Sequence, residues 1–454
     1  MTSEWRPVRL GELVSIKHGW PFKSSLFSPT LSGRPIVVAV GNFCYTGGFR
    51  FDDTNIKEYT GAYPLQYELR PGEILLVMTC QTEGGEILGL PATIPDDGRV
   101  YLHNQRLGKV EIKNAQEIDS RYLYWLFLTR EFNKELCASA TGTKIVHTAP
   151  SRIEAFQFFL PSISEQKEIA AVLDAIEAKI ELNQQMNVNL EAMARVLYKS
   201  WFVDFDPFKD ESSNLSGLSR ELLDWQPLNR RENQLVSSRI GDIPQGWRIS
   251  SLGEYLSIAE TGGRPKGGVK GIVGGIVSIG AESIIGIGRF DFSKVKFVPR
   301  DFYDSMTKGR ISDRDVLLYK DGGRPGEFEP HVSMFGDEFP FAQACINEHV
   351  YRLRTTPELN QPYLYFALES DRLKEEMRTK GTGVAIPGLN SSALRSLTFL
   401  IPPADVLASF SRMVTPWIDQ ILANANESRR LMETRDQLLP RLLSGELRMP
   451  NERD

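Results

Sequence analysis

Residues 165–197 read EQKEIAAVLDAIEAKIELNQQMNVNLEAMARVL. Apolar residues recur in this segment at alternating steps of four and three, which is typical of a helix that packs lengthwise against another helix. The steps fall on Ile169, Leu173, Ile176, Ile180, Asn183, Asn187, Leu190, Ala194 and Leu197. The segment therefore predicts a long helix whose packing seam has one polar interruption, at Asn183 and Asn187.

A second ladder of the same kind lies near the end of the chain, 241 residues after the first. Its steps fall on Phe410, Val414, Trp417, Ile421, Asn424, Ser428, Leu431, Arg435 and Leu438. Asn424 and Ser428 occupy the positions that match Asn183 and Asn187. Two unrelated amphipathic helices would be the simpler explanation, but the matched polar layer favours two helices that pack on each other as an antiparallel coiled coil.

The ladders are the ends of a repeat that covers each half of the chain. Trp5-Arg6 matches Trp247-Arg248, and Asn104-Gln105 matches Asn347-Glu348, at spacings of 242 and 243 residues. We predict an α+β fold of two tandem repeats, each a mixed α/β globule followed by a long helix. The expected segments are residues 1–160 and 244–402 for the globules, 161–208 and 403–454 for the helices with the C-terminal tail, and 209–243 for a polar connector.

Within each globule, runs rich in β-branched residues predict short strands, and a longer apolar pattern predicts one helix. The helix of the first globule should run from Ser120, as its cap, to about Ser139, and that of the second from Pro362 to about Lys380. Pro416 falls inside the second ladder and predicts a kink or a late helix start. The expected strands are Arg34–Val40, Glu73–Thr79, Arg99–Val110, Ile272–Ile279, Asp315–Lys320 and Glu348–Leu353.

Composition bounds the class of protein. A chain of 454 residues with 41% hydrophobic and 24% charged residues is expected to form two or three globular domains. It has no apolar run of eighteen residues and no signal-peptide pattern, and its four cysteines form no CxxC pair, which favours a cytoplasmic protein with reduced thiols. The net charge is −5, but residues 151–243 carry 10 basic and 15 acidic groups, so the globules are near neutral. A basic face on each globule is therefore allowed but not required.

A search for catalytic motifs finds none. The chain lacks a P-loop, an Asn-Pro-Pro-aromatic tetrapeptide and histidines at metal-binding spacing. Asp96, Glu111 and Lys113 have the carboxylate–carboxylate–lysine order of a metal-dependent nuclease, but Asp96 also lies in a strong turn signal, which is the commoner explanation. We therefore expect no catalytic, cofactor-binding or metal site, and no enzymatic activity.

Two glycine-broken loops, residues 16–25 and 261–270, combine cations and hydroxyls in matching places of the repeat. Glycine lets backbone approach phosphates, and Lys and Arg supply the attraction, although either loop alone could be an ordinary solvated loop. Residues 79–82 and 319–324 follow the most strand-like run of their globule, and they carry side chains that can contact base edges. The DNA-binding candidates are Lys17, His18, Lys23, Ser24, Gln81, Thr82, Gln105, Arg106, Lys144, Arg264, Lys266, Lys270, Lys320, Asp321, Arg324 and His349.

Four strings together carry a family resemblance: LPSISEQKEI at 160–169, LYKSWFVDFDP at 197–207, IGDIPQGW at 240–247 and LLPRLLSGEL at 438–447. With them, the whole chain resembles the specificity subunits of type I restriction–modification enzymes. It departs from the family locally, because the second helix begins with Asp405-Val406-Leu407 where the first has Glu165-Gln166. Base-contacting residues vary within this family, so the resemblance assigns none of the candidates.

The resemblance implies two target-recognition domains that each bind one half of an asymmetric, bipartite sequence in double-stranded DNA. The long helices would form the spacer and dock two DNA-methyltransferase (modification) subunits, and restriction/translocase subunits would complete the complex. S-adenosylmethionine, ATP and Mg would be bound by those partners and not by this chain. No association with a membrane is expected. The alternative is a repeat-built protein–protein scaffold that does not bind DNA.

Overall fold

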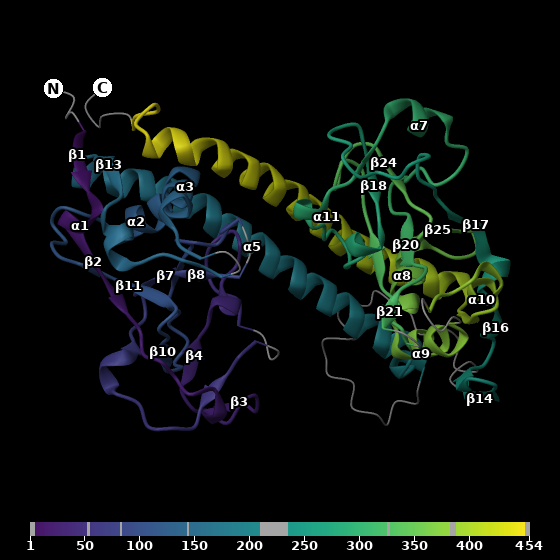
Figure 1. Cartoon of the computed structure of the whole chain (residues 1–454). Coiled ribbons are helices and arrows are strands. Elements are labelled where there is room, and N and C mark those ends of the chain that lie inside the picture. Colours follow the sequence, from purple (N-terminus) through teal and green to yellow (C-terminus); the bar gives the residue numbers. More distant parts are fainter. Residues whose placement is uncertain are drawn as a thin grey trace. The chain divides into compact units, whose positions relative to one another are not determined.

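The computed structural model describes residues 5–51, 55–81, 84–142, 145–208, 235–324, 327–381 and 387–449, without the side chains of residues 323, 324 and 327. The chain divides into two compact units (Figure 1). Unit 1 comprises residues 1–178 and 431–454, and unit 2 comprises residues 179–430. The division into five segments stays a prediction. None of the helices in the described part of the chain has the length and hydropathy needed to span a bilayer.

Unit 1 is built on a four-stranded antiparallel sheet in the order β2-β11-β7-β9. A second sheet of five strands has the order β3-β5-β4-β10-β6, and in it β10 runs parallel to β4. The predicted strand over Arg99–Val110 is in fact two, β10 and β11, which belong to different sheets. The strands are β1 (Arg6–Arg9), β2 (Val14–His18), β3 (Phe27–Ser28), β4 (Ile36–Val38), β5 (Glu58–Tyr59), β6 (Glu68–Leu69), β7 (Ile74–Val77), β8 (Thr79–Cys80), β9 (Pro91–Thr93), β10 (Tyr101–His103), β11 (Leu107–Ile112), β12 (Val146–His147) and β13 (Gln157–Leu160).

Helices cover the apolar face of this sheet, where the core of unit 1 lies. Tyr122 and Trp125, which α2 contributes, are almost completely buried, as are Phe132 and Leu136 from α3. This burial supplies most of the stability of a helix of eight to ten residues, which would be marginal alone. The helices are α1 (Leu10–Leu13), α2 (Ser120–Phe127), α3 (Arg130–Ser139), α4 (Pro150–Glu154) and the N-terminal part of α5 (Ile163–Phe202).

Unit 2 repeats this plan. Its four-stranded antiparallel sheet has the order β17-β25-β20-β23, and its β24 runs parallel to β18, as β10 does to β4. Residues 235–244 form a hairpin, β14-β15, of which 235–243 lie in the region predicted as connector. The elements are β14 (Leu235–Ser238), β15 (Gly241–Pro244), β16 (Arg248–Ser251), β17 (Leu256–Thr261), β18 (Ile276–Ile279), β19 (Phe297–Val298), α7 (Arg300–Ser305), β20 (Val316–Tyr319), β21 (Gly323–Arg324), β22 (Glu327–Phe328), β23 (Val332–Met334), β24 (Ala344–Ile346), β25 (Val350–Thr355), α8 (Gln361–Glu369), α9 (Asp371–Lys380), α10 (Ser391–Arg395), β26 (Thr398–Ile401) and α11 (Ala404–Leu443).

The single helix predicted for each globule is wrong, because each is broken into two. Thr129 ends α2 and begins α3: its hydroxyl donates to the Leu126 carbonyl at 2.7 Å and accepts from the Phe132 amide. Ser370 does the same between α8 and α9, 241 residues later. One hydroxyl thus satisfies both helix ends, which favours a break at this position. The cap of α2 is also Asp119, not Ser120, because the Asp119 carboxylate accepts the Arg121 and Tyr122 amides.

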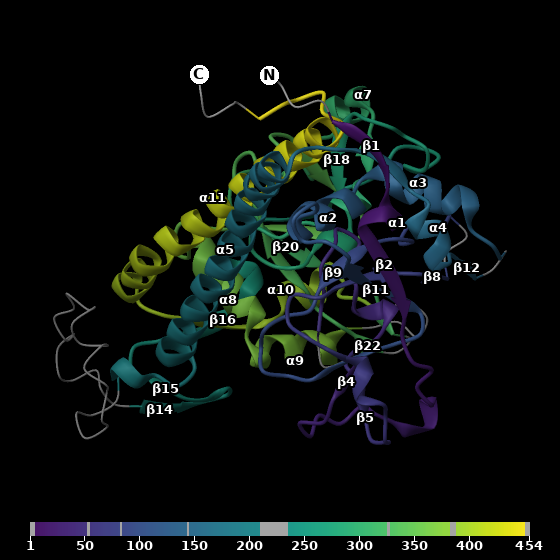
Figure 2. The same cartoon turned by 90° about the vertical axis from the view of Figure 1, so that its left-hand side faces the viewer.

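The two predicted long helices, α5 and α11, have 40 residues each (Figures 1 and 2). Each is therefore about 60 Å long. The prediction of a late start at Pro416 is wrong, because α11 begins at Ala404 and continues through the proline. Pro416 and Arg412 are exposed, so water can satisfy the carbonyl that the missing amide leaves free.

Every residue of the predicted seam is buried or half-buried. Residues of α5 contact residues of α11 within unit 1 and within unit 2. In unit 1, Ile169 and Leu173 of α5 share a core cluster with Leu439 and Leu442 of α11. The fully buried members of the predicted seam are Ile169, Leu173, Ile180, Asn183, Phe410, Val414, Ile421 and Asn424, and the half-buried ones are Ile176, Leu190, Leu197, Trp417, Leu431 and Leu438.

The predicted polar layer lies in unit 2, where its members bond to one another. Asn183 Nδ2 donates to Ser428 Oγ at 3.4 Å, and Asn424 Nδ2 donates to Asn187 Oδ1 at 2.8 Å. The 241-residue offset converts the first pair into the second, so the layer has the two-fold relation expected of a duplicated helix. From the first pair to the second, the residue number rises on α5 from 183 to 187 and falls on α11 from 428 to 424. The two helices therefore run antiparallel at this layer.

Candidate nucleic-acid interface

A tight turn joins β10 to β11 in unit 1, and its backbone conformation is set by Asn104. The Asn104 side-chain oxygen accepts the amide of Arg106 at 3.0 Å, and the Asn104 carbonyl accepts that of Leu107 at 3.0 Å. We call residues 104–106 the unit 1 reading turn. Gln105 and Arg106 are exposed on it. Such an asparagine turn holds the backbone while it leaves the next two side chains free.

The loop that follows β2 packs directly against this turn. The Trp20 amide donates to the His103 carbonyl at 2.9 Å, and the Gln105 amide donates to the Trp20 carbonyl at 3.1 Å. A Cβ at Gly19 would lie 2.3 Å from the Asn104 carbonyl, so only glycine allows this approach. Of the candidates at the end of β2, His18 pairs with Gly108, two residues after Arg106, while Lys17 pairs with Lys109 and its Nζ lies 3.8 Å from Glu111.

A buried histidine supports the turn from below. His103 is 2% exposed, and its Nε2 lies 2.8 Å from the Leu107 carbonyl. Burial lowers the pKa of His103 to about 4, despite the opposing effect of that hydrogen bond. The ring is therefore neutral near pH 7, and the bond requires Nε2 to carry the hydrogen and donate it.

Unit 2 contains the same turn at residues 347–349, the unit 2 reading turn, between β24 and β25. The Asn347 side-chain oxygen accepts the amide of His349 at 2.9 Å. The Gly262 amide donates to the Asn347 carbonyl at 3.1 Å, and a Cβ at Gly262 would lie 1.7 Å from the Ile346 carbonyl. Gly262 therefore corresponds to Gly19, and the loop after β17 packs on the turn as its counterpart does in unit 1.

In each unit, the residue that follows a central strand of the four-stranded sheet contacts the reading turn. The strand is β7 in unit 1 and β20 in unit 2. In unit 1 the Met78 amide donates to the Arg106 carbonyl, and in unit 2 the Lys320 amide donates to the His349 carbonyl, both at 3.0 Å. Beyond these residues, Thr79 pairs with His147 between β8 and β12, and Asp321 forms the equivalent bridge with Gly388. The Thr79 hydroxyl also lies 3.0 Å from His147 Nδ1.

Charged side chains of unit 2 are already paired around the reading turn. Arg264 Nε lies 2.7 Å from Glu348 Oε1, and His349 Nδ1 lies 2.5 Å from Asp321 Oδ1. Lys320 Nζ is 3.6 Å from Asp321 and 3.4 Å from the Glu348 carbonyl. Burial and the nearby Asp321 carboxylate raise the pKa of the adjacent Tyr319. A polyanion that approaches this surface would compete with Asp321 and Glu348 for Arg264 and Lys320.

The structure thus gathers about half of the predicted residues at one end of the four-stranded sheet of their unit. They are Lys17, His18, Gln105 and Arg106 in unit 1, and Arg264, Lys320, Asp321 and His349 in unit 2. Lys23 and Ser24 lie further along the loop of unit 1, and Lys266 and Lys270 are exposed on the long loop of unit 2. Gln81 is exposed directly after β8.

Three candidates cannot be placed. Thr82 and Lys144 lie outside the described residues, as does the side chain of Arg324 on β21. Sequence reasoning missed His147, because the repeat has Gly388 at the matching position and offers no second copy as a signal. Glu348 is absent from the predicted DNA-binding residues, although it contacts both Arg264 and His349.

The nuclease-like residues do not assemble. Lys113 Nζ donates to the Gly11 carbonyl, while Glu111 lies beside Lys17 and Lys109. Within the described ranges, no group of three or more His, Cys, Asp or Glu residues could hold a metal ion.

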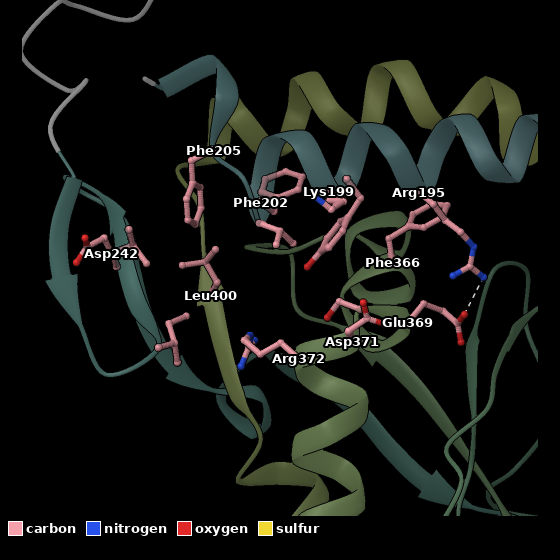
Figure 3. Close-up of a pocket in the computed structure, with 15 residues that line it drawn as sticks. Arg195, Lys199, Phe202, Phe205, Asp242, Phe366, Glu369, Asp371, Arg372 and Leu400 are labelled. Atoms are coloured by element: carbon pink, nitrogen blue, oxygen red, sulfur yellow. Dashed lines mark hydrogen bonds and ion pairs between the residues drawn. The ribbon is translucent and has the colours of Figure 1, made fainter. Parts of the chain in front are cut away.

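A cavity of about 300 Å³ lies in unit 2, and residues 347–349 of the reading turn are not among those that line it (Figure 3). Its walls come from the last turns of α5, the α8–α9 junction and β15, with Phe202, Phe205 and Leu400 as apolar lining. The Arg195–Glu369 ion pair at 2.7 Å closes one side. None of the predicted DNA-binding residues lines this cavity.

Comparison with known proteins agrees with the sequence strings. Residues 2–192 match the family model described as "Type I restriction modification DNA specificity domain". The chain is 25% identical to the type I restriction enzyme HindI specificity subunit of Haemophilus influenzae, over 98% of this chain and 100% of that one. It is 27% identical to the type I restriction enzyme MjaIX specificity subunit of Methanocaldococcus jannaschii, over 73% of this chain and 69% of that one.

The fold is also found in a solved structure. The S subunit of a type I restriction–modification system from M. genitalium superposes with a TM-score of 0.56, over 97% of this chain and 96% of that one. The sequence identity is 15%, so this likeness concerns the fold alone. The expected mixed α/β fold is confirmed.

Proposed function

We propose that the chain selects the DNA target of a type I restriction–modification complex. Residues 2–192 match the type I DNA specificity domain, and the chain is 25% and 27% identical to two type I restriction enzyme specificity subunits. In this role it is a non-catalytic subunit. The chemistry would belong to its partners, two DNA-methyltransferase subunits that bind S-adenosylmethionine and restriction/translocase subunits that use ATP and Mg. The complex would act in the cytoplasm, on double-stranded DNA.

The target would be bipartite, with one half-site for each unit. The observation that carries this proposal is the pair of reading turns. They share two hydrogen bonds, one from the amide of the third turn residue to the asparagine side chain and one that the carbonyl of that residue accepts, but they differ in the side chains of the two residues after the asparagine. Unit 1 offers Gln105 and Arg106, whereas unit 2 offers Glu348 and His349. Base edges in the major groove differ in their donors and acceptors, so these pairs would favour different sequences. The target would therefore be asymmetric.

The long helices would set the distance between the half-sites. We propose that α5 and α11 pair as an antiparallel coiled coil over their length, because contacts of this sense occur in unit 1 and in unit 2. Helices of about 60 Å are long enough to separate two readers by more than one DNA turn of about 34–36 Å. The polar layer of Asn183, Asn187, Asn424 and Ser428 would fix their register.

The exchange of residues 1–150 for a homologous segment tests the proposal. We expect the assembled complex to methylate a new sequence in which one half-site has changed while the other half-site and the spacing are kept. Mapping of methylated adenines gives both halves at once. A change in both halves would contradict the assignment of one half-site to each unit.

The alternative, a protein–protein scaffold that does not bind DNA, predicts a different result. Under that hypothesis the complete complex would show no preferred sequence, and competition with unrelated DNA would abolish any binding. Binding that survives a large excess of unrelated DNA, but not an excess of target DNA, would exclude the scaffold.

A further inference from the structure

The two reading turns differ in hydrogen-bonding character as well as in sequence. Gln105 and Arg106 of unit 1 are exposed, and neither side chain has an acidic partner among the described residues. Arginine offers only donors, which match the two acceptors of guanine in the major groove. Glutamine offers one donor and one acceptor, which match adenine. Unit 1 thus presents a pair suited to purines.

Unit 2 presents an acceptor at the equivalent position. Glu348 stands where unit 1 has Gln105, and an ionised carboxylate accepts hydrogen bonds but cannot donate them. The amino groups of cytosine and adenine are the donors in the major groove, whereas guanine offers only acceptors there. A carboxylate at this place therefore favours cytosine or adenine and repels guanine.

In the free protein Arg264 occupies this carboxylate. Arg264 Nε bonds to Glu348 Oε1 at 2.7 Å, while Glu348 Oε2 is buried without a partner among the described residues. An unpaired buried carboxylate oxygen is costly, so the side chain has a reason to move when a better partner arrives. The Arg264 side chain is 60% exposed, and a DNA phosphate can compete for its guanidinium.

We propose that the two residues after the turn asparagine are the base-reading pair of each unit, with different preferences. Gln105 and Arg106 select purines, with guanine opposite Arg106. Glu348 selects cytosine or adenine through the amino group, after Arg264 has moved from Glu348 to a phosphate. The inference rests on the proposed function, because it assumes that these turns face DNA.

Reciprocal exchange in the assembled complex tests the pairs. Gln105→Glu with Arg106→His gives unit 1 the pair of unit 2, and Glu348→Gln with His349→Arg does the reverse. We expect each exchange to change the preferred base at one position of its own half-site, by about ten- to a hundred-fold in relative binding. The other half-site should not change, because the other turn keeps its residues.

Two single substitutions separate reading from folding and from phosphate contact. Glu348→Gln keeps the size of the side chain and supplies a donor, so it should admit adenine over cytosine even if the double exchange fails to assemble. Arg264→Gln should weaken binding to all sequences alike and reduce its salt dependence, with no change of preferred base. Glu375→Gln on α9, where the side chain is 71% exposed, is the matched control and should change nothing.

The possible failures are distinct. If the wild-type complex methylates a defined sequence and Glu348→Gln leaves every position of it unchanged, the inference is wrong while the proposed function stands. A base change caused by Arg264→Gln would also overturn it, because Arg264 would then be a reader. If the wild-type complex shows no defined sequence at all, the proposed function itself fails.

Discussion

Substitution of Glu191 by alanine should loosen the globular part of unit 2 from α5. The Glu191 carboxylate is 8% exposed, and it accepts from Arg195 at 2.7 Å and from Arg289 at 2.8 Å. It also accepts the hydroxyl of Tyr365, a buried residue of α8, at 3.4 Å. One carboxylate thus joins α5 to two other segments of the same unit.

The magnitude follows from what each partner loses. Removal of one member of a buried ion pair costs about 3–5 kcal/mol. Arg195 and Arg289 are 41% and 47% exposed, and Arg195 keeps Glu369 as a second partner, so water and Glu369 recover part of this free energy. We expect Glu191→Ala to lower the free energy of unfolding of unit 2 by about 2–3 kcal/mol. For a unit of this size that corresponds to a Tm about 4–10 °C lower.

Thermal unfolding and amide hydrogen exchange measure the effect. Exchange should rise in α8 of unit 2 but not in α2 of unit 1, and Glu191→Gln, which keeps an acceptor, should cost about half as much. Asp304→Ala removes an exposed ion pair with Arg300 on α7 and serves as the control, with an expected loss of at most about 0.5 kcal/mol. If Glu191→Ala costs no more than Asp304→Ala, the carboxylate does not hold the unit together.

Two other predictions concern single features. His103 is buried and its pKa is lowered to about 4, so between pH 6.5 and 4 the unfolded chain binds a proton that the folded chain does not. The free energy of unfolding of unit 1 should therefore fall by about 2–3 kcal/mol between pH 7 and 4.5. His103→Gln should remove this part of the loss in urea titrations, and an unchanged loss would refute the reasoning. Asn187→Leu should cost about 1–3 kcal/mol, because Asn424 Nδ2 loses the Asn187 oxygen as its acceptor. The double substitution with Asn424→Leu should restore stability but relax the spacing of methylated sites. A spacing as uniform as in the wild type would count against a register role.

The sequence predicts the parts of the fold that are local or repeated. The heptad ladder from Ile169 to Leu197 predicts α5 because helical periodicity depends only on nearby residues. The duplicated offset then predicts that both units contain the same elements. The breaks at Thr129 and Ser370 could also have been predicted, since a hydroxyl residue recurs at the same repeat position in the middle of each apolar pattern. The hairpin at 235–244 had no matching copy and was missed.

The arrangement of the candidate interface could be predicted only in part. Matching loops indicated that Lys17 and Arg264 belong to related surfaces, but their neighbours depend on pairing between distant strands. Nothing local indicates that Met78 contacts Arg106, or that Arg264 pairs with Glu348, 84 residues later. Such contacts follow from sheet order, which the alternation of apolar residues does not specify.

The two internal copies show which positions of the reading turn are constrained by the fold. Both copies keep asparagine at 104 and 347, because its side chain closes the turn, and glycine at 19 and 262, where a Cβ would overlap a carbonyl. At the two positions that follow the asparagine, the hydrogen bonds common to both copies come from backbone groups. In unit 1 the side chains there are exposed and can change at little cost in stability, whereas in unit 2 Glu348 and His349 are paired with Arg264 and Asp321. If the turns bind DNA as proposed, a substitution at these positions in one unit would change the base preference of that unit and leave the turn of the other unit intact.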